Sequence, residues 1–211
     1  MLKNQIKWKK LSSIIILIVG SLIGILVMIL PLVDKYKTDI IKSGIIKDQF
    51  AVGNLQANPG WSGYESLLGV MFIAGLCIAL ILINKKNIKT GIWVLFANTV
   101  IFMFLTMWII VPKIEKYSQN AAIEFYQAHQ DEDCYIKTIE FKSYAHLFYG
   151  KTKKQTNADS HNEDWQLRGK LDKKIYYIMK IDKADEMAKY PQIKKLYERN
   201  GFVFFVREPE K

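Results

Sequence analysis

The stretch LSSIIILIVGSLIGILVMILPLV, residues 11–33, decides the fold class, because none of its side chains carries a charge. An α-helix rises about 1.5 Å per residue, so about twenty residues cross a hydrocarbon core of roughly 30 Å. Residues 66–84 and 90–112 form two further uncharged stretches of comparable length. The sequence therefore predicts a membrane protein with three transmembrane helices, at about 11–31, 65–83 and 92–111.

The first stretch could instead be a cleaved signal peptide, because lysines precede it at positions 3, 7, 9 and 10. Signal peptides have an apolar region of about 7–15 residues, which ends in a cleavage site with small residues. This stretch is longer, and no such site follows Leu30-Pro31. We therefore expect a retained helix.

Lysines next to the predicted spans indicate the orientation of the chain. Lys85, Lys86 and Lys89 lie in the short second connection, which has no acidic residue. The positive-inside rule therefore places this connection and the lysine-rich N-terminus in the cytoplasm. The outer loop, residues 32–64, also carries four lysines, and these oppose the assignment. With three spans, we expect residues 113–211 to lie opposite the N-terminus, outside the cytoplasm.

The net charge of +10 is concentrated in the membrane region. Residues 1–112 have 11 lysines and 4 acidic residues, whereas residues 113–211 have 19 basic and 16 acidic residues. Basic residues at the ends of spans meet anionic lipid head groups. Because no basic stripe alternates with stacking aromatic residues, we expect membrane lipid as a partner and no nucleic acid.

Residues 113–211 predict one small extracytoplasmic α/β domain with a mainly parallel, three-stranded sheet. Apolar residues at three- and four-residue spacing predict a helix over 112–130. Strands are predicted at 134–139, 173–181 and 202–208, and further helices at 144–150 and 183–201. Ser143 is the expected cap of the helix at 144–150. Pro191 interrupts the last helix, and Asn200-Gly201 is expected to end it.

The sequence predicts no metal or cofactor site. Asp131, Glu132 and Asp133 lack the alternating ligands and the turn glycine of a hard-cation loop. The three histidines, at positions 129, 146 and 161, lack metal-ligand spacing. Cys77 lies in a predicted span and Cys134 in the soluble part, so we expect no disulfide between them. The sequence has no P-loop, zinc-protease or serine-hydrolase motif.

Two stretches carry the residues of a candidate binding site. The first is QANPGWSGYE, residues 56–65, whose polar and stacking groups for a head group or sugar are Gln56, Asn58, Trp61 and Glu65. Alternatively, Trp61 and Tyr64 are membrane-interface anchors, because their rings favour the head-group level.

The second stretch is FKSYAHLFYG, residues 141–150. On a helix, Tyr144, Leu147 and Phe148 share one face, which we expect to pack on the sheet. Lys142 and His146 then lie nearer the other side. Alternatively, Lys142, Tyr144 and His146 line a surface that faces the membrane, where lysine binds phosphate and tyrosine stacks on a sugar.

Five stretches together resemble the C-terminal part of bacterial, Bacteroidetes-type family-39 glycosyltransferases. They are FAVGNLQANPGWSGYE (50–65), VPKIEKYSQNAAIEFYQ (111–127), EDCYIKTIEFKSYAHLFYG (132–150), DKKIYYIMKIDKADE (172–186) and YERNGFVFFVREP (197–209). This family is related to the protein O-mannosyltransferases and the lipid A aminoarabinose transferases. The resemblance extends over nearly the whole chain.

The resemblance implies an integral membrane enzyme of GT-C architecture, which transfers a sugar from a polyprenyl-phosphate carrier to a lipid or protein acceptor. Such a transfer needs a carboxylate base and a cation at the leaving phosphate. Lys35 or Lys47 would supply the cation. The catalytic acid of the family lies in an N-terminal outer loop, whereas Asp34 is the one carboxylate at the membrane edge after the first span here.

We therefore expect a donor-binding C-terminal module that is inactive alone and pairs with the missing N-terminal transferase portion, as a split subunit or a remnant. A hypothesis from another class is a non-catalytic, membrane-anchored interaction or scaffold protein of the cell envelope. An adjacent reading frame that encodes the remaining spans would favour the transferase.

Overall fold

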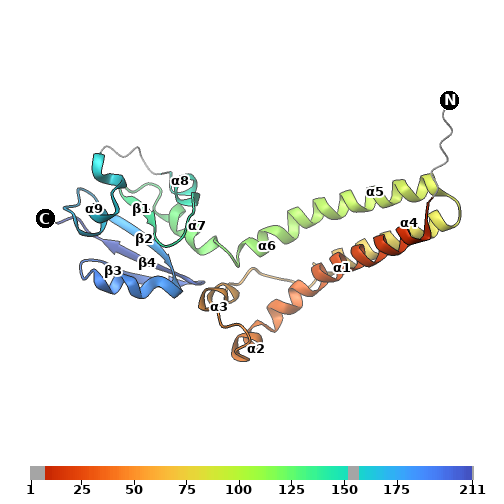
Figure 1. Cartoon of the computed structure of the whole chain (residues 1–211), viewed down its shortest axis with the longest axis horizontal. Coiled ribbons are helices and arrows are strands. Elements are labelled where there is room, and N and C mark those ends of the chain that lie inside the picture. The colour runs from red at the N-terminus through yellow and green to blue at the C-terminus, as the bar shows by residue number, and fades with distance from the viewer. Residues whose placement is uncertain (1–7, 152–156, 211) are drawn as a thin grey trace. The chain divides into compact units, whose positions relative to one another are not determined.

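The computed structural model describes residues 8–151 and 157–210, and its elements are labelled in Figure 1. The lysines at positions 3 and 7, used above for orientation, lie outside these residues. The chain divides into two compact units, Met1–Tyr36 with Pro59–Ile114, and Lys37–Asn58 with Glu115–Lys211. Segment 37–58, part of the outer loop in the sequence analysis, thus folds with the C-terminal residues.

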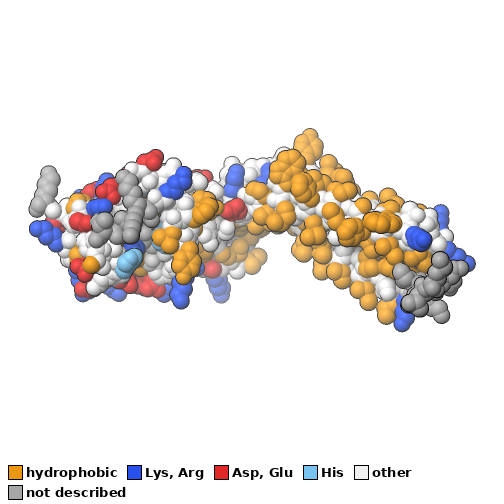
Figure 2. All heavy atoms as spheres, turned by 90° about the horizontal axis from the view of Figure 1, so that it is seen from above, with side chains coloured by type: hydrophobic (Ala, Val, Ile, Leu, Met, Phe, Trp, Pro, Cys, Tyr) orange, Lys and Arg blue, Asp and Glu red, His pale blue; other side chains and the backbone are white. Residues whose placement is uncertain are grey.

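The first unit is built from three long apolar helices. They are α1 (Lys10–Lys35), α4 (Ser66–Asn84) and α5 (Ile88–Leu105), the last continued by the π-helical turn η1 (Thr106–Ile110) and by α6 (Val111–Glu115). Each of the three is long and apolar enough to cross a membrane, as predicted. Figure 2 shows hydrophobic side chains over most of the visible surface of this unit. Such a surface is typical of helices that face lipid.

Close contacts between backbones, a hydrogen bond and a pair of stacked rings hold these helices together. α4 packs against both α1 and α5. A Cβ atom on Gly69 of α4 would lie 2.2 Å from the carbonyl oxygen of Gly24 in α1, so only glycine fits there. The Asn98 amide donates a hydrogen bond of 3.0 Å to the carbonyl of Phe72, and the Phe72 and Phe102 rings stack at 4.0 Å. Small residues and interhelical hydrogen bonds stabilise helix pairs in lipid, where hydrophobic burial contributes little.

The second unit contains a mixed four-stranded sheet with strand order β1-β2-β4-β3. Its strands are β1 (Tyr135–Thr138), β2 (Ile175–Lys180), β3 (Lys194–Arg199) and β4 (Phe202–Arg207). β1 pairs with β2 in parallel, whereas β4 is antiparallel to both β2 and β3. The prediction of a mainly parallel, three-stranded sheet is therefore wrong, although β1, β2 and β4 lie where strands were predicted.

Helices cover both faces of this sheet. On one face lie α3 (Gln49–Leu55), α7 (Asn120–Ala128) and α8 (Ala145–Tyr149), and on the other lie α9 (Glu163–Arg168) and the 3-10 helix η3 (Ile181–Lys189). The short helices α2 (Lys37–Lys42) and η2 (Ala158–His161) complete the unit. Every residue of β4 is buried, because β4 is a central strand covered on both faces.

The predicted helix over 183–201 is the main error in this unit. Its second half is β3, an edge strand in which every residue is exposed and four of six are charged. Charged residues protect a sheet edge from pairing with other chains, and they also remove the apolar alternation that signals a strand. Asn200 and Gly201 have φ angles of 48° and 80°, so they form the hairpin turn between β3 and β4 and do not end a helix.

Two smaller differences concern the helices. The predicted helix over 112–130 is interrupted at residues 116–119, where the chain turns between α6 and α7. α1 continues through Pro31 to Lys35, beyond its predicted end. Neighbouring helices compensate for the hydrogen bond that proline removes in such segments.

Candidate functional site

α3 places residues of the outer loop on the sheet domain. A Cβ atom on Gly53 would lie 2.5 Å from the Cα atom of Gly201, and the rings of Phe50 and Phe202 meet edge to face at 5.2 Å. The Asp48 carboxylate caps α3 by accepting hydrogen bonds from the amides of Phe50 and Ala51. A pocket lies on each side of this helix.

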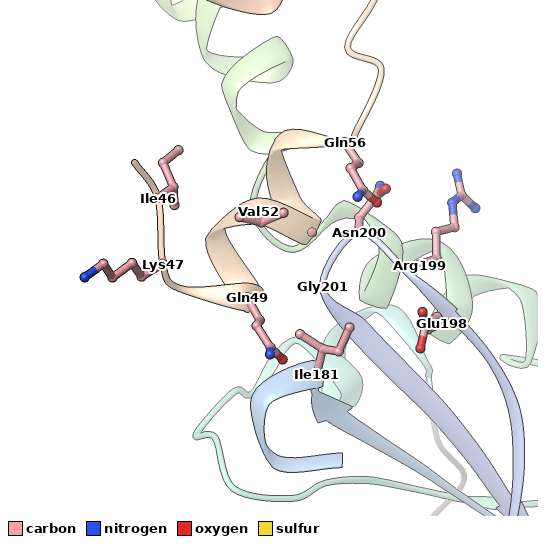
Figure 3. A pocket seen from close by; sticks show the side chains of 11 residues that line it. Ile46, Lys47, Gln49, Val52, Gln56, Ile181, Glu198, Arg199, Asn200 and Gly201 are labelled. Atoms are coloured by element: carbon pink, nitrogen blue, oxygen red, sulfur yellow. The ribbon is translucent and has the colours of Figure 1, made fainter. Parts of the chain in front are cut away.

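The first, the hairpin pocket, has a volume of about 420 Å³ and lies between α3 and the β3–β4 turn. Its lining residues are Ile46, Lys47, Gln49, Val52, Gly53, Gln56, Ile181, Glu198, Arg199, Asn200 and Gly201. Figure 3 shows the amides of Gln56 and Asn200 beside each other, while Lys47 and Arg199 extend away from them. Arg199 pairs with Glu124 at 2.7 Å. This pocket therefore offers amide groups, which bind hydroxyls, and its cations point elsewhere.

The second, the lysine pocket, has a volume of about 390 Å³. It is lined by Phe50, Asn54, Ser118, Gln119, Glu140, Phe141, Lys142, Lys180 and Phe202. Lys142 follows β1 and Lys180 ends β2, so the pocket lies at the carboxyl ends of the two parallel strands, beside the start of the antiparallel strand β4 at Phe202.

Two cationic side chains, Lys142 and Lys180, and one carboxylate, Glu140, line the lysine pocket. The Lys180 ammonium lies 4.7 Å from the centroid of the Phe50 ring. Within the described residues, neither Lys142 nor Lys180 forms an ion pair. Glu140 has a φ angle of 60°, an unusual conformation for a residue other than glycine, and it turns the chain from β1 toward the pocket wall.

A third pocket, of about 380 Å³, adjoins the lysine pocket and shares Phe141 and Lys142 with it. The remaining lining residues are Lys137, Thr138, Ser143, Tyr144 and His146. It thus brings together Lys142, Tyr144 and His146, which the second interpretation of FKSYAHLFYG places on one surface. That this surface faces the membrane stays a prediction. Burial lowers the pKa of His146 and that of Lys137, which disfavours the protonated form of both side chains.

The other interpretation, in which Tyr144, Leu147 and Phe148 pack on the sheet, is wrong. These side chains are 81%, 56% and 75% exposed. Ala145 and Tyr149 contact the core instead. α8 has only five residues and its N-cap is Tyr144, so the prediction that Ser143 is the cap is wrong by one position; the Ser143 hydroxyl accepts a hydrogen bond of 3.2 Å from the Ala145 amide in the turn before the helix.

Glu65 and Trp61 lie in the first unit, with Lys113. The Glu65 carboxylate is 2.8 Å from the Lys113 ammonium and accepts hydrogen bonds from the amides of Ser62 and Gly63. Burial by itself would raise the pKa of Glu65, but hydrogen bonds from Lys113 and Ser62 outweigh it and lower that pKa to about 2. The same ammonium lies 5.4 Å from the centroid of the Trp61 ring. The carboxylate therefore stabilises its own loop and is poorly suited to accept a proton.

The predicted site residues thus fall into separate groups. Lys47 and Gln56 line the hairpin pocket. Lys142, Tyr144 and His146 line the third pocket, and Lys142 also lines the lysine pocket. Trp61 and Glu65 share a cluster with Lys113. Asn58 ends segment 37–58 and lines none of the three pockets. Sequence analysis missed Phe50 and Lys180, because only the packing of α3 on the sheet brings them together.

The described residues include no cluster of three or more histidine, cysteine or acidic side chains that could hold a metal ion. Comparisons with models of protein families, with curated proteins and with solved structures find no match to the chain. Function is therefore inferred from the chemistry of the pockets and from the sequence.

Proposed function

We propose that the chain is the C-terminal module of an integral membrane glycosyltransferase. In this role it binds the phosphate-bearing head group of a polyprenyl-phosphate-linked sugar donor in the lysine pocket. The chain lies in a bacterial inner membrane with the sheet domain on the periplasmic side. An N-terminal transferase portion supplies the catalytic carboxylate.

The observation that carries this proposal is the composition of the lysine pocket. α3, from the connection between the first two candidate spans, forms one wall, and the ends of β1 and β2 form another. The Lys142 and Lys180 ammonium groups supply charge for a phosphate, which binds lysine as a point charge. The Gln119 amide and the Glu140 carboxylate are available for sugar hydroxyls.

The proposal assigns binding, and not bond cleavage, to this chain. Among the described residues, Glu65 is the one buried carboxylate, and its ion pair keeps it deprotonated. A general base for the acceptor hydroxyl needs a carboxylate that can take up a proton near neutral pH. We therefore expect the purified chain to bind donor lipid without releasing the sugar.

The test measures binding of farnesyl phosphate to the full chain in phosphatidylcholine nanodiscs, by isothermal titration calorimetry. Loss of two charge-assisted contacts predicts that the double variant Lys142→Gln/Lys180→Gln binds at least about tenfold more weakly, equivalent to about 1.4 kcal/mol. Lys170→Gln, at an exposed position of the same unit, is the matched control and should bind as the wild type does.

Equal affinity of the wild type and the double variant would contradict the assignment of the pocket. If no phosphate lipid binds and the chain instead purifies with unrelated envelope proteins, the membrane-anchored interaction protein becomes the better description. Sugar release from a polyprenyl-phosphate-sugar by the chain alone would refute the non-catalytic role.

A further inference from the structure

α8 exposes a compact apolar surface on the second unit. Tyr144, Leu147 and Phe148 are 81%, 56% and 75% exposed, and their three- and four-residue spacing puts them on one side of the helix. The opposite side is fixed, because Ala145 and Tyr149 pack against the core. We name the three exposed side chains the α8 tip. Single exposed apolar residues are common, but three large ones on one short helix form a patch.

Exposed lysines flank α8 in the sequence. Lys142 lies two residues before Tyr144, the N-cap of α8, and Lys151 follows Gly150. Lys137 is a third lysine in the adjoining pocket, whereas Glu140 is the one acidic residue from 137 to 151. Apolar and aromatic side chains next to lysines are the composition of surfaces that insert into the interface of anionic bilayers.

We propose that the α8 tip docks into the head-group region of the membrane to which the chain is anchored, with its lysines on anionic lipids. The chain passes between the two units three times, at 36–37, 58–59 and 114–115, so the sheet domain is tethered at the membrane. Such a tether keeps the local concentration of bilayer high, so even a small apolar surface suffices for contact. The lysines beside the tip favour an anionic bilayer over a protein partner, because they attract anionic head groups.

Docking of the tip has a consequence for the lysine pocket. Lys142 lines that pocket and lies two residues before Tyr144. A docked α8 tip therefore holds the pocket opening close to the lipid head groups, where a membrane-borne ligand presents its phosphate. The docking itself does not depend on the proposed glycosyl transfer, since the exposed side chains and lysines are present whatever the pocket binds.

The test places a fluorescent NBD label at Leu147→Cys, in a full chain that also carries Cys77→Ala. The remaining native cysteine, Cys134, is buried, and burial raises the pKa of its thiol to about 11, so it reacts poorly with maleimides. The labelled chain is reconstituted into nanodiscs that contain phosphatidylglycerol and doxyl-labelled lipid. A label at Lys170→Cys is the matched control on an exposed position of the same unit.

We expect blue-shifted emission and several-fold stronger quenching by the doxyl lipid at position 147 than at 170. Added Phe148→Asn, and separately Lys151→Gln, should each reduce the quenching, the latter only in phosphatidylglycerol. Equal, weak quenching at 147 and 170 would overturn the proposal. Weak lipid quenching at 147, together with crosslinking to a protein by a thiol-attached photocrosslinker at the same cysteine, would overturn it in favour of a protein partner.

Discussion

The structure gives Glu65 a different role from the one that its sequence context suggests. Its place beside Trp61 and an Asn-Pro-Gly turn indicates a sugar ligand, whereas the structure gives it an ion pair with Lys113 and two backbone hydrogen bonds. Lys113 lies 48 positions away in the sequence, so no local pattern predicts the pairing. By contrast, the sequence alone places Lys142, Tyr144 and His146 together, because they lie within five positions of each other and line one pocket.

The Glu65 ion pair predicts an acid-sensitive contribution to stability. Because the pKa in the folded protein is about 2 against an ordinary value of 4.5, the contribution is complete above about pH 4.5. It is lost as the pH falls toward 2. Glu65→Gln should destabilise the chain by about 1–3 kcal/mol at neutral pH, because a buried hydrogen-bonded ion pair loses its charge. It should also remove this part of the acid dependence.

Thermal unfolding in detergent, followed by circular dichroism from neutral pH to about pH 2, measures both effects. Glu163→Gln removes an exposed carboxylate and serves as the control, for which we expect little change. A Glu65→Gln chain with the stability and the acid profile of the wild type would show that the ion pair contributes nothing.

At the scale of elements, a helix or strand could be predicted from the sequence when its signal lies within its own residues. Uncharged runs identified α1, α4 and α5, and apolar runs identified β2 and β4, because these signals are local. β3 was missed because its charged, exposed residues carry no strand signal. The role of α3 was also missed, since its partner Gly201 lies about 150 residues later.

The contact of α3 with the hairpin turn predicts unequal effects of two glycine substitutions. Gly44 and Gly201 both have positive φ angles, 68° and 80°. A Cβ atom at Gly44 meets nothing within 4 Å, whereas at Gly201 it would lie 2.8 Å from the Phe50 carbonyl oxygen in α3. Gly44→Ala should cost about 1 kcal/mol for backbone strain alone, and Gly201→Ala at least about 1 kcal/mol more.

Thermal unfolding of the two variants gives this difference directly. Limited proteolysis between residues 43 and 48 gives a second readout, because release of α3 should speed cleavage in Gly201→Ala more than in Gly44→Ala. Equal destabilisation and equal cleavage would show that α3 is not packed on the hairpin.

At the scale of the whole molecule, the fold restricts the membrane topology. α3 follows the first candidate span, and the sheet follows the third, yet both belong to one compact unit. They must therefore lie on the same side of the membrane. Three crossings give this arrangement, because an even number of spans separates α3 from the sheet. The positive-inside rule predicts which side that is, because it assigns the connection with lysines at 85, 86 and 89 to the cytoplasm.

The central claim is that segment 37–58 and the sheet domain form one unit outside the cytoplasm, and cysteine accessibility tests it most directly. Exposed positions Lys42, Lys86 and Lys170 are each changed to cysteine in a Cys77→Ala chain. Intact cells, with the outer membrane permeabilised, are treated with a membrane-impermeant maleimide. We expect labelling at 42 and 170, and labelling at 86 only after the inner membrane is lysed. Labelling at 86 alone in intact cells, or different results at 42 and 170, would contradict the account.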